Sequence, residues 1–206
     1  MIQKFILYVA AGILIFFIGG GLLFNELLPA KTIDFQSYFS KNKHFSSMEE
    51  GMEIEVKKLS KDNVYLRVTL KPFAAGPLEH IHQNFDEYFV IEKGTLSLLI
   101  NGQKRILKAG ESILIPKGTP HKPFNETAQE VILNDKNERQ PTMPAYFAYG
   151  LSQLYPVIDE YGSKSPKVLF QLARLGPSFD TWLADAPLFS QKAIRWILKP
   201  PAHVFL

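Results

Sequence analysis

The chain has 206 residues, which is enough for one domain of ordinary size with appendages. Its 23 Lys and Arg residues against 20 Asp and Glu residues leave a net charge of +3, too mild a balance to suggest a nucleic-acid partner. The sequence contains no cysteine, which excludes disulfides, iron–sulfur clusters and thiol nucleophiles. A metal site in this chain must therefore use histidine and carboxylate side chains.

The N-terminal segment is apolar. From Phe5 to Phe24 there is no charged residue, and a helix of about 20 such residues spans the hydrocarbon core of a bilayer. A cleaved signal peptide is the alternative, with Leu28-Pro29-Ala30 as a poor cleavage site, but the apolar core of a signal is usually only about 7–15 residues. We therefore expect residues 5–24 to be a single-pass membrane anchor within a segment 1–30. The side of the membrane on which the rest of the chain lies stays open.

The middle of the chain has the pattern of short strands. Residues 31–51 are expected to be a polar linker or a short helix, after which apolar and polar residues alternate through 52–57 and 64–71. Asn101-Gly102 supplies the positive φ angles of a type I′ turn, which predicts a hairpin. Further strands are predicted at 88–92, 95–100, 103–107, 112–116 and 130–133. Short strands broken by Gly and Pro at regular spacing predict a sandwich or barrel.

After about Pro144 the pattern becomes helical. Ser165-Pro166 and Gly176 have the chemistry of a helix start and a helix stop. A last helix is predicted from Gln191 to Leu198, ended by Pro200-Pro201. The apolar faces of these helices must be buried against something. We expect this tail to pack on the outside of the barrel, away from any metal pocket.

The last predicted helix is basic on one side. Lys192, Arg195 and Lys199 fall at helical spacing, with Trp196 near the border of the apolar side. Such a helix can lie on an anionic membrane surface. The alternative, which we prefer, is a helix that covers the barrel wall while its basic side is solvated.

Three histidines and one glutamate are candidate metal ligands. In His80-Ile81-His82 the two imidazoles point to the same side if the segment is a strand. Glu87 follows on or entering the next strand, and His121 belongs to a second block rich in Gly and Pro. Three neutral imidazoles and one carboxylate suit a divalent transition metal of borderline softness.

The spacing of these residues resembles the two signature motifs of the cupin superfamily, over about residues 50–135. The first motif is matched by His80, His82, Glu87 and Gly94. The second is matched at every fixed position, by Gly110, Pro116, Gly118, His121 and Asn125. One position departs from the pattern, because Ala74 stands where the first motif opens with glycine, although Gly76 lies nearby.

The resemblance implies a mainly β fold, the double-stranded β-helix or jelly-roll barrel. We place it at residues 31–142, between the transmembrane segment and a helical extension at 143–206. The resemblance also implies that one divalent metal (Fe, Mn, Zn, Ni or Cu) is bound by His80, His82, Glu87 and His121. Four protein ligands on an ion that can take six leave positions open for water, dioxygen or a chelating substrate.

Two further residues are expected in the pocket. Phe89 lies on the same side of its strand as Glu87 and is expected to form part of an apolar wall. Asn125 is expected to lie on the His121 side, where it would orient a ligand or water.

These features predict a membrane-anchored metal cupin that acts on a small organic molecule, as a dioxygenase or other oxidoreductase. A metal-dependent isomerase or epimerase is the alternative, but it needs a separate general base, which the sequence does not nominate. A non-catalytic module that binds or senses a small ligand is a third reading, and a homodimer is compatible with each. An ordered polar pair near the metal would favour an enzyme, and a wholly apolar pocket would favour the binding module.

Overall fold

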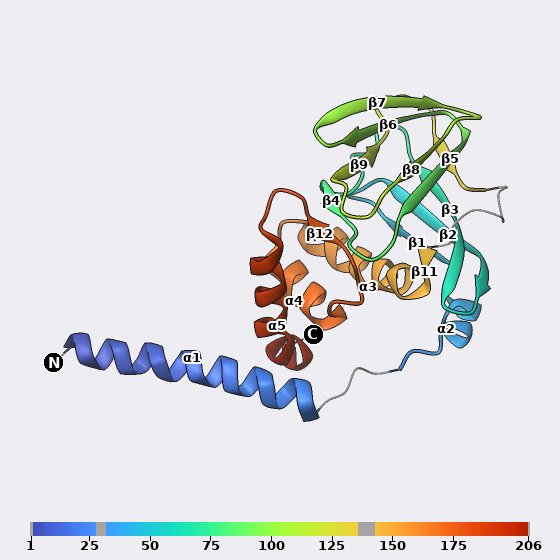
Figure 1. The fold of residues 1–206 in the computed structure, drawn as a ribbon. Coiled ribbons are helices and arrows are strands. Elements are labelled where there is room, and N and C mark those ends of the chain that lie inside the picture. Colours follow the sequence, from blue (N-terminus) through green and yellow to red (C-terminus); the bar gives the residue numbers. More distant parts are fainter. Residues whose placement is uncertain (1, 28–31, 136–142, 206) are drawn as a thin grey trace.

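The structure is a computed structural model that describes residues 2–27, 32–135 and 143–205. The predicted cleavage site at 28–30 lies outside the described residues, as does the end of the predicted barrel segment at 136–142. A long N-terminal helix projects from a body in which a β-sandwich lies on a group of C-terminal helices (Figure 1).

Two antiparallel sheets form the sandwich. The larger sheet runs in the order β1 (His44–Ser47), β2 (Met52–Ser60), β3 (Asn63–Leu70), β10 (Val131–Leu133), β5 (Glu87–Lys93) and β8 (Ser112–Ile115), with β11 (Met143–Pro144) paired to β3. The smaller sheet runs in the order β12 (Trp182–Leu183), β4 (His80–Ile81), β9 (His121–Phe124), β6 (Thr95–Ile100) and β7 (Gln103–Lys108). The predicted strands of residues 52–133 are thereby confirmed.

The alternation in the sequence sets the register of the first long hairpin. Met52 pairs with Leu70 and Ile54 pairs with Val68, and all four side chains are buried. Period two therefore directs one face of β2 and β3 into the core. The second hairpin, β6–β7, closes through Asn101-Gly102, where φ is 49° at Asn101 and 73° at Gly102, as the predicted type I′ turn requires.

The segment predicted as a linker or short helix contains both a helix and a strand. Helix α2 (Phe35–Lys41) begins at Asp34, whose side chain accepts a hydrogen bond from the Ser37 amide. Strand β1 follows and pairs with β2 along the edge of the larger sheet. The strand is only four residues long, too short for alternation of apolar and polar residues to predict it.

The tail is mainly helical, as predicted. It contains α4 (Pro166–Leu175) and α5 (Leu188–Phe205), which overlap the two predicted helices, and α3 (Ala145–Tyr161), which was not predicted as a separate helix. Helix α4 has the predicted ends, with Ser165 accepting from the Lys167 amide and Gly176 at φ 72°. The predicted end of α5 was wrong, because the helix continues through Pro200-Pro201. Proline removes a hydrogen bond from a helix, but its fixed φ is itself helical, so a helix can continue past it.

The expected place of the tail was also wrong in one respect. Helix α3 does not simply cover the outer wall, because its apolar face joins the same buried core as the strands. Phe147, Leu154 and Tyr155 of α3 and Phe179 beyond α4 belong to that core. The interior of the sandwich offers apolar side chains that α3 can bury, and this is why the helix packs inward rather than only on the outer wall.

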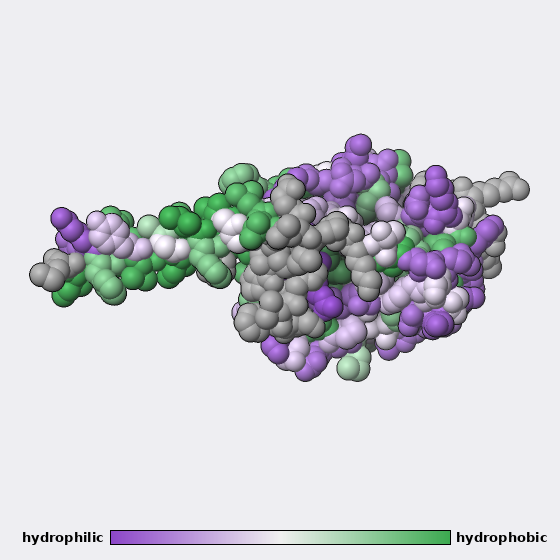
Figure 2. Space-filling view, turned by 90° about the horizontal axis from the view of Figure 1, so that it is seen from below, coloured by the Kyte–Doolittle hydropathy of each residue, from purple (hydrophilic) through white to green (hydrophobic). Residues whose placement is uncertain are grey.

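Helix α1 (Ile2–Leu27) contains the one stretch of the described residues, Ile2–Leu23, that is long and apolar enough to cross a membrane. Figure 2 shows it as a mostly hydrophobic rod that projects from the body. Near its C-terminal end, Gly21 is buried against α5, where a Cβ on Gly21 would lie 3.0 Å from the Trp196 ring. An apolar N-terminal helix is therefore confirmed, and its insertion into a membrane stays a prediction.

Candidate metal centre

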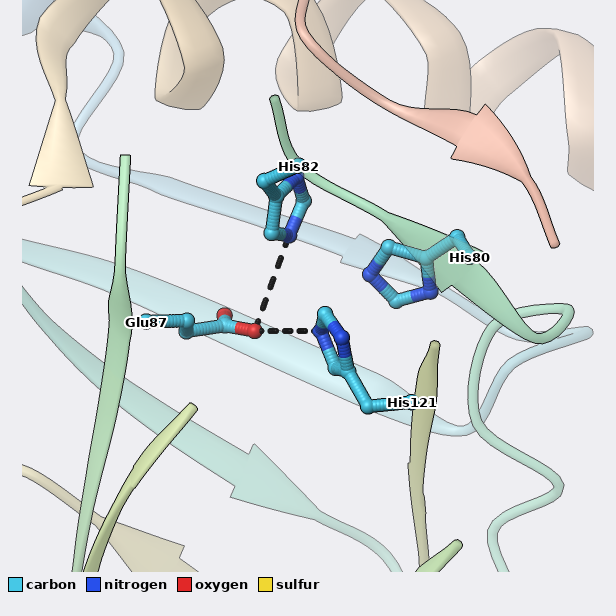
Figure 3. Close-up of side chains that lie close together, drawn as sticks. All are labelled: His80, His82, Glu87 and His121. Carbon is cyan, nitrogen blue, oxygen red and sulfur yellow. Dashed lines mark hydrogen bonds and ion pairs between the residues drawn. The ribbon is translucent and has the colours of Figure 1, made fainter. Parts of the chain in front are cut away.

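The four predicted ligands converge inside the sandwich. His80 lies on β4 directly opposite His121 on β9, His82 follows β4, and Glu87 opens β5. One ligand atom from each of the four lies within 4.8 Å of all the others (Figure 3). Strand pairing thus brings together two blocks that the sequence separates.

Each imidazole is held by its Nδ1 atom. A backbone carbonyl can only accept a hydrogen bond, so an Nδ1 that contacts one carries the proton and leaves the Nε2 lone pair free. The pairs are His80 with the Leu78 carbonyl at 2.8 Å, His82 with that of Asp180 at 2.6 Å, and His121 with that of Thr119 at 2.9 Å. All three side chains therefore direct Nε2 toward the cluster as the atom that can coordinate a cation, and that of His121 is hydrogen-bonded to Glu87.

The buried polar atoms of the cluster fit a metal ion. The Oε2 atom of Glu87 lies 2.8 Å from His121 Nε2 and 3.6 Å from His82 Nε2. His82 is only 2% exposed, and within the described part of the chain its Nε2 has no hydrogen-bond partner. A buried nitrogen without a partner costs free energy that a coordinated cation would offset.

The surroundings shift the pKa values of the candidate ligand side chains. Burial, together with the neighbouring His82 and His121, lowers the pKa of His80 to about 3, so His80 is neutral. Burial alone would raise the pKa of Glu87, but the hydrogen bond from His121 and the nearby imidazole of His82 hold it well below its usual range. Burial lowers the pKa of His121, yet its hydrogen bond to Glu87 outweighs that effect and the net pKa is raised. A cation would replace the proton shared by this pair.

A segment of the tail orients His82, which the sequence did not predict. Strand β12 pairs with β4, and the Asp180 carbonyl before it accepts from His82. The Asp180 carboxylate accepts from the amides of Gln83 and Asn84 at 2.8 and 2.6 Å and from Trp182 Nε1 at 2.8 Å. One aspartate therefore fixes the loop after β4 through both its backbone and its side chain.

Arg195 of α5 holds the segment around Asp180 in place. The expectation that the basic side of α5 is solvated was therefore wrong for Arg195. Arg195 is 6% exposed, donates to the carbonyls of Phe179 and Thr181, and lies 3.9 Å over the Trp182 ring. Both carbonyls lie outside any helix or strand, and that of Phe179 also accepts from the Thr181 amide. Helix α5 packs mainly on α4 rather than on the wall of the sandwich.

A cavity of about 90 Å³ lies beside His80 and Glu87. Phe89 lines it, as predicted. The prediction that the tail stays out of this pocket was wrong, because the lining also includes Phe147, Leu151, Leu154, Tyr155, Phe179 and Thr181. The chain has to close one end of the sandwich with apolar side chains, and α3 and the segment after α4 provide them.

Asn125 has a different place from the one expected. Its Nδ2 donates to the carbonyls of Lys71 and Gln129, and its Oδ1 accepts from the amide and hydroxyl of Thr127. These bonds occupy the side-chain amide in joining the loop after β9 to the end of β3, so Asn125 is not part of the proposed binding site.

Two polar residues of the cavity were not predicted from the sequence. Glu50 is 7% exposed and Tyr155 is 1% exposed, and both line the cavity that His80 and Glu87 also line. Glu50 stands in an acidic turn next to Glu49, and the sequence offers no signal that separates a buried carboxylate from an exposed one there. Tyr155 could have been found as one of the aromatic residues of the predicted helical tail.

Comparison with known proteins agrees with this geometry. Residues 66–134 match the sequence family described as the Cupin domain, so the chain contains a cupin domain, as its two motifs predicted. No curated protein matches the chain.

Several solved structures are similar to it. They include KdgF from Halomonas sp. (19% identity, covering 46% of this chain and 85% of that one, TM-score 0.39). A sugar phosphate isomerase of the cupin superfamily from Silicibacter pomeroyi has 21% identity, with 43% and 62% covered and a TM-score of 0.38. A cupin-2 domain containing protein from Shewanella frigidimarina has 29% identity, with 50% and 91% covered and a TM-score of 0.35.

Proposed function

We propose that the chain is a membrane-anchored cupin that binds one divalent transition metal and acts on a small organic molecule. The observation that carries the proposal is the cluster of three imidazoles, each with Nδ1 tied to a backbone carbonyl, around the carboxylate of Glu87. A divalent ion bound there would supply a Lewis acid with coordination positions left for a ligand.

The content of the cavity favours an enzyme over a binding module. The walls are largely apolar, but they include the polar side chains of Glu50, Tyr155 and Thr181 in addition to the cluster. The cavity volume of about 90 Å³ favours a small substrate in this conformation.

Two reaction classes remain, oxidation by a dioxygenase or related oxidoreductase, and isomerisation or epimerisation. An isomerase needs a general base, which the sequence did not nominate, and Glu50 in the cavity wall is a candidate for that role. This buried carboxyl makes isomerisation the better supported class. Oxygen uptake by the metal-loaded chain in the presence of a substrate would instead support oxidation.

The metal site is tested on the full chain purified in detergent. We expect about one equivalent of metal per chain in the wild type, measured by elemental analysis, and a loss of about 10-fold or more in affinity for His82→Ala. His44→Ala is the matched control, because His44 is exposed on β1 and lies outside the cluster. Equal metal content in the wild type and His82→Ala would contradict the proposal.

The anchor is tested by extraction. Carbonate treatment should leave the full-length protein in the membrane pellet, since the apolar surface of α1 needs lipid around it. N-terminal sequencing provides the second measurement. A mature chain that starts near Lys31 would show that the segment is a cleaved signal instead.

A further inference from the structure

A carboxyl group lines the same cavity as the metal cluster. Glu50 belongs to the turn between β1 and β2, on the larger sheet, whereas His80 and His121 belong to the smaller sheet. A glutamate in a hairpin turn is ordinarily solvated. This one is buried among apolar cavity residues, which include Met52, Leu66 and Phe147.

The turn is built to hold Glu50 in this position. Asp159 of α3 accepts hydrogen bonds from the Ser47 hydroxyl at 2.8 Å and from the amides of Met48 and Glu49 at 2.9 and 3.1 Å. The Glu50 amide in turn donates to the Ser47 hydroxyl at 3.1 Å. Helix α3 therefore fixes the backbone that leads into the buried carboxyl.

Helix α3 also fixes the side chain of Glu50. Tyr155 precedes Asp159 by one helical turn, so both face the β1–β2 turn. Tyr155 and Glu50 line the same cavity, and among the causes that lower the pKa of the Glu50 carboxyl the Tyr155 hydroxyl is the largest. Burial raises the pKa of Tyr155 well above its usual value, so the phenol stays protonated and can donate to the carboxyl.

The surroundings keep the carboxyl close to half ionised at neutral pH. Burial raises the pKa of Glu50 to about 7, and the nearby Glu49 and Asp159 add to the rise, whereas the bond from Tyr155 and the charge of Lys122 oppose it. A group with a pKa near the working pH can both accept and return a proton.

We infer that Glu50 transfers protons to and from the molecule bound in the cavity, with Tyr155 as its positioning residue, and that this molecule is a small carbonyl compound with a hydrogen on the neighbouring carbon. The inference rests on the proposed function. The Glu50 carboxylate takes the proton from that carbon, and the electrons of the broken C–H bond form a C=C bond as the carbonyl becomes an enolate. When that neighbouring carbon also carries a hydroxyl group, Glu50 then returns the proton to the former carbonyl carbon. The hydroxyl proton of the neighbouring carbon passes to the former carbonyl oxygen, which completes an isomerisation without any oxidant.

The titration of Glu50 can be measured without turnover. Infrared spectra of the metal-free full chain in D₂O should contain a protonated-carboxyl band that disappears as the pH passes through about 7. The band should be absent from Glu50→Gln and present in Glu49→Gln, the exposed neighbour in the same turn. In Tyr155→Phe its midpoint should move to higher pH, because the lost hydrogen bond favoured the ionised form. A wild-type spectrum with no such band refutes the inference.

Proton transfer is tested with hydroxyacetone, a small α-hydroxy ketone, on the full chain loaded with Mn²⁺ and separately with Zn²⁺. In D₂O we expect deuterium on the hydroxymethyl carbon, and a rate lower by about 100-fold or more in Glu50→Gln at unchanged metal content. Equal exchange in Glu50→Gln and wild type overturns the inference. Absence of exchange in a metal-loaded wild type also overturns it and leaves the metal site standing, whereas a chain that binds no metal overturns the proposed function.

Discussion

The buried carboxyl of Glu50 should make the stability of the protein depend on pH, and Glu50→Gln should remove that dependence. Burial raises the pKa of Glu50 from 4.5 to about 7 in the folded state. Between these values the folded chain keeps a proton that the unfolded chain has lost. The contribution of Glu50 is therefore fully present below pH 4.5 and is lost as the pH rises through about 7.

The size of the effect follows from the two pKa values. One pKa unit corresponds to about 1.4 kcal/mol, so the shift costs the wild type about 3 kcal/mol of unfolding free energy by about pH 8. Glutamine stays neutral throughout this range and can still accept from Tyr155. The stability of Glu50→Gln relative to wild type should therefore rise by about 3 kcal/mol from acidic to mildly alkaline pH.

Denaturant unfolding of the full chain in detergent, followed by tryptophan fluorescence from about pH 5 to about pH 8, measures this difference. Other groups titrate in the same range, but they are common to both proteins and cancel when the two profiles are subtracted. Glu49→Gln serves as the control, because Glu49 is exposed in the same turn. Parallel profiles for Glu50→Gln and wild type would refute the claim that this carboxyl is held protonated by burial.

Three further perturbations test other parts of the structure. Arg195→Ala should lower the unfolding free energy by about 3 kcal/mol in denaturant titrations, because it removes the hydrogen bonds to the Phe179 and Thr181 carbonyls and the contact with the Trp182 ring. It should also weaken metal binding by about 10-fold through the loosened Asp180, whereas Lys192→Ala, an exposed neighbour on α5, should do neither. Gly76→Ala should cost at least about 3 kcal/mol, since the added Cβ would lie 1.9 Å from a backbone carbonyl at φ +66°, while Gly102→Ala, in open space, should cost about 1 kcal/mol. A chelator should lower the unfolding temperature of the metal-loaded chain, by an amount equivalent to about 2.7 kcal/mol if the free metal had been at 100 times its dissociation constant; an unchanged melting curve would contradict a structural contribution from the metal.

The sequence by itself determined the local features of this protein. The length of the apolar run sets α1, and alternation sets β2 and β3. The Asn101-Gly102 pair sets the turn of the β6–β7 hairpin. The metal cluster was also readable, because residues two apart on a strand share a face and motif spacing places His121 opposite them. Each of these features depends on neighbours along the chain or on one pair of adjacent strands.

Tertiary structure decided what surrounds the cluster. Glu50 comes from the β1–β2 turn, whereas Tyr155, Asp180 and Arg195 come from the C-terminal tail, and each has its role only because of the segments that pack against it. Nothing in the local sequence distinguishes the buried Glu50 from the exposed Glu49 beside it. Burial and hydrogen-bond partners are properties of contacts between remote segments, and those contacts set the pKa of a carboxyl and the orientation of an imidazole.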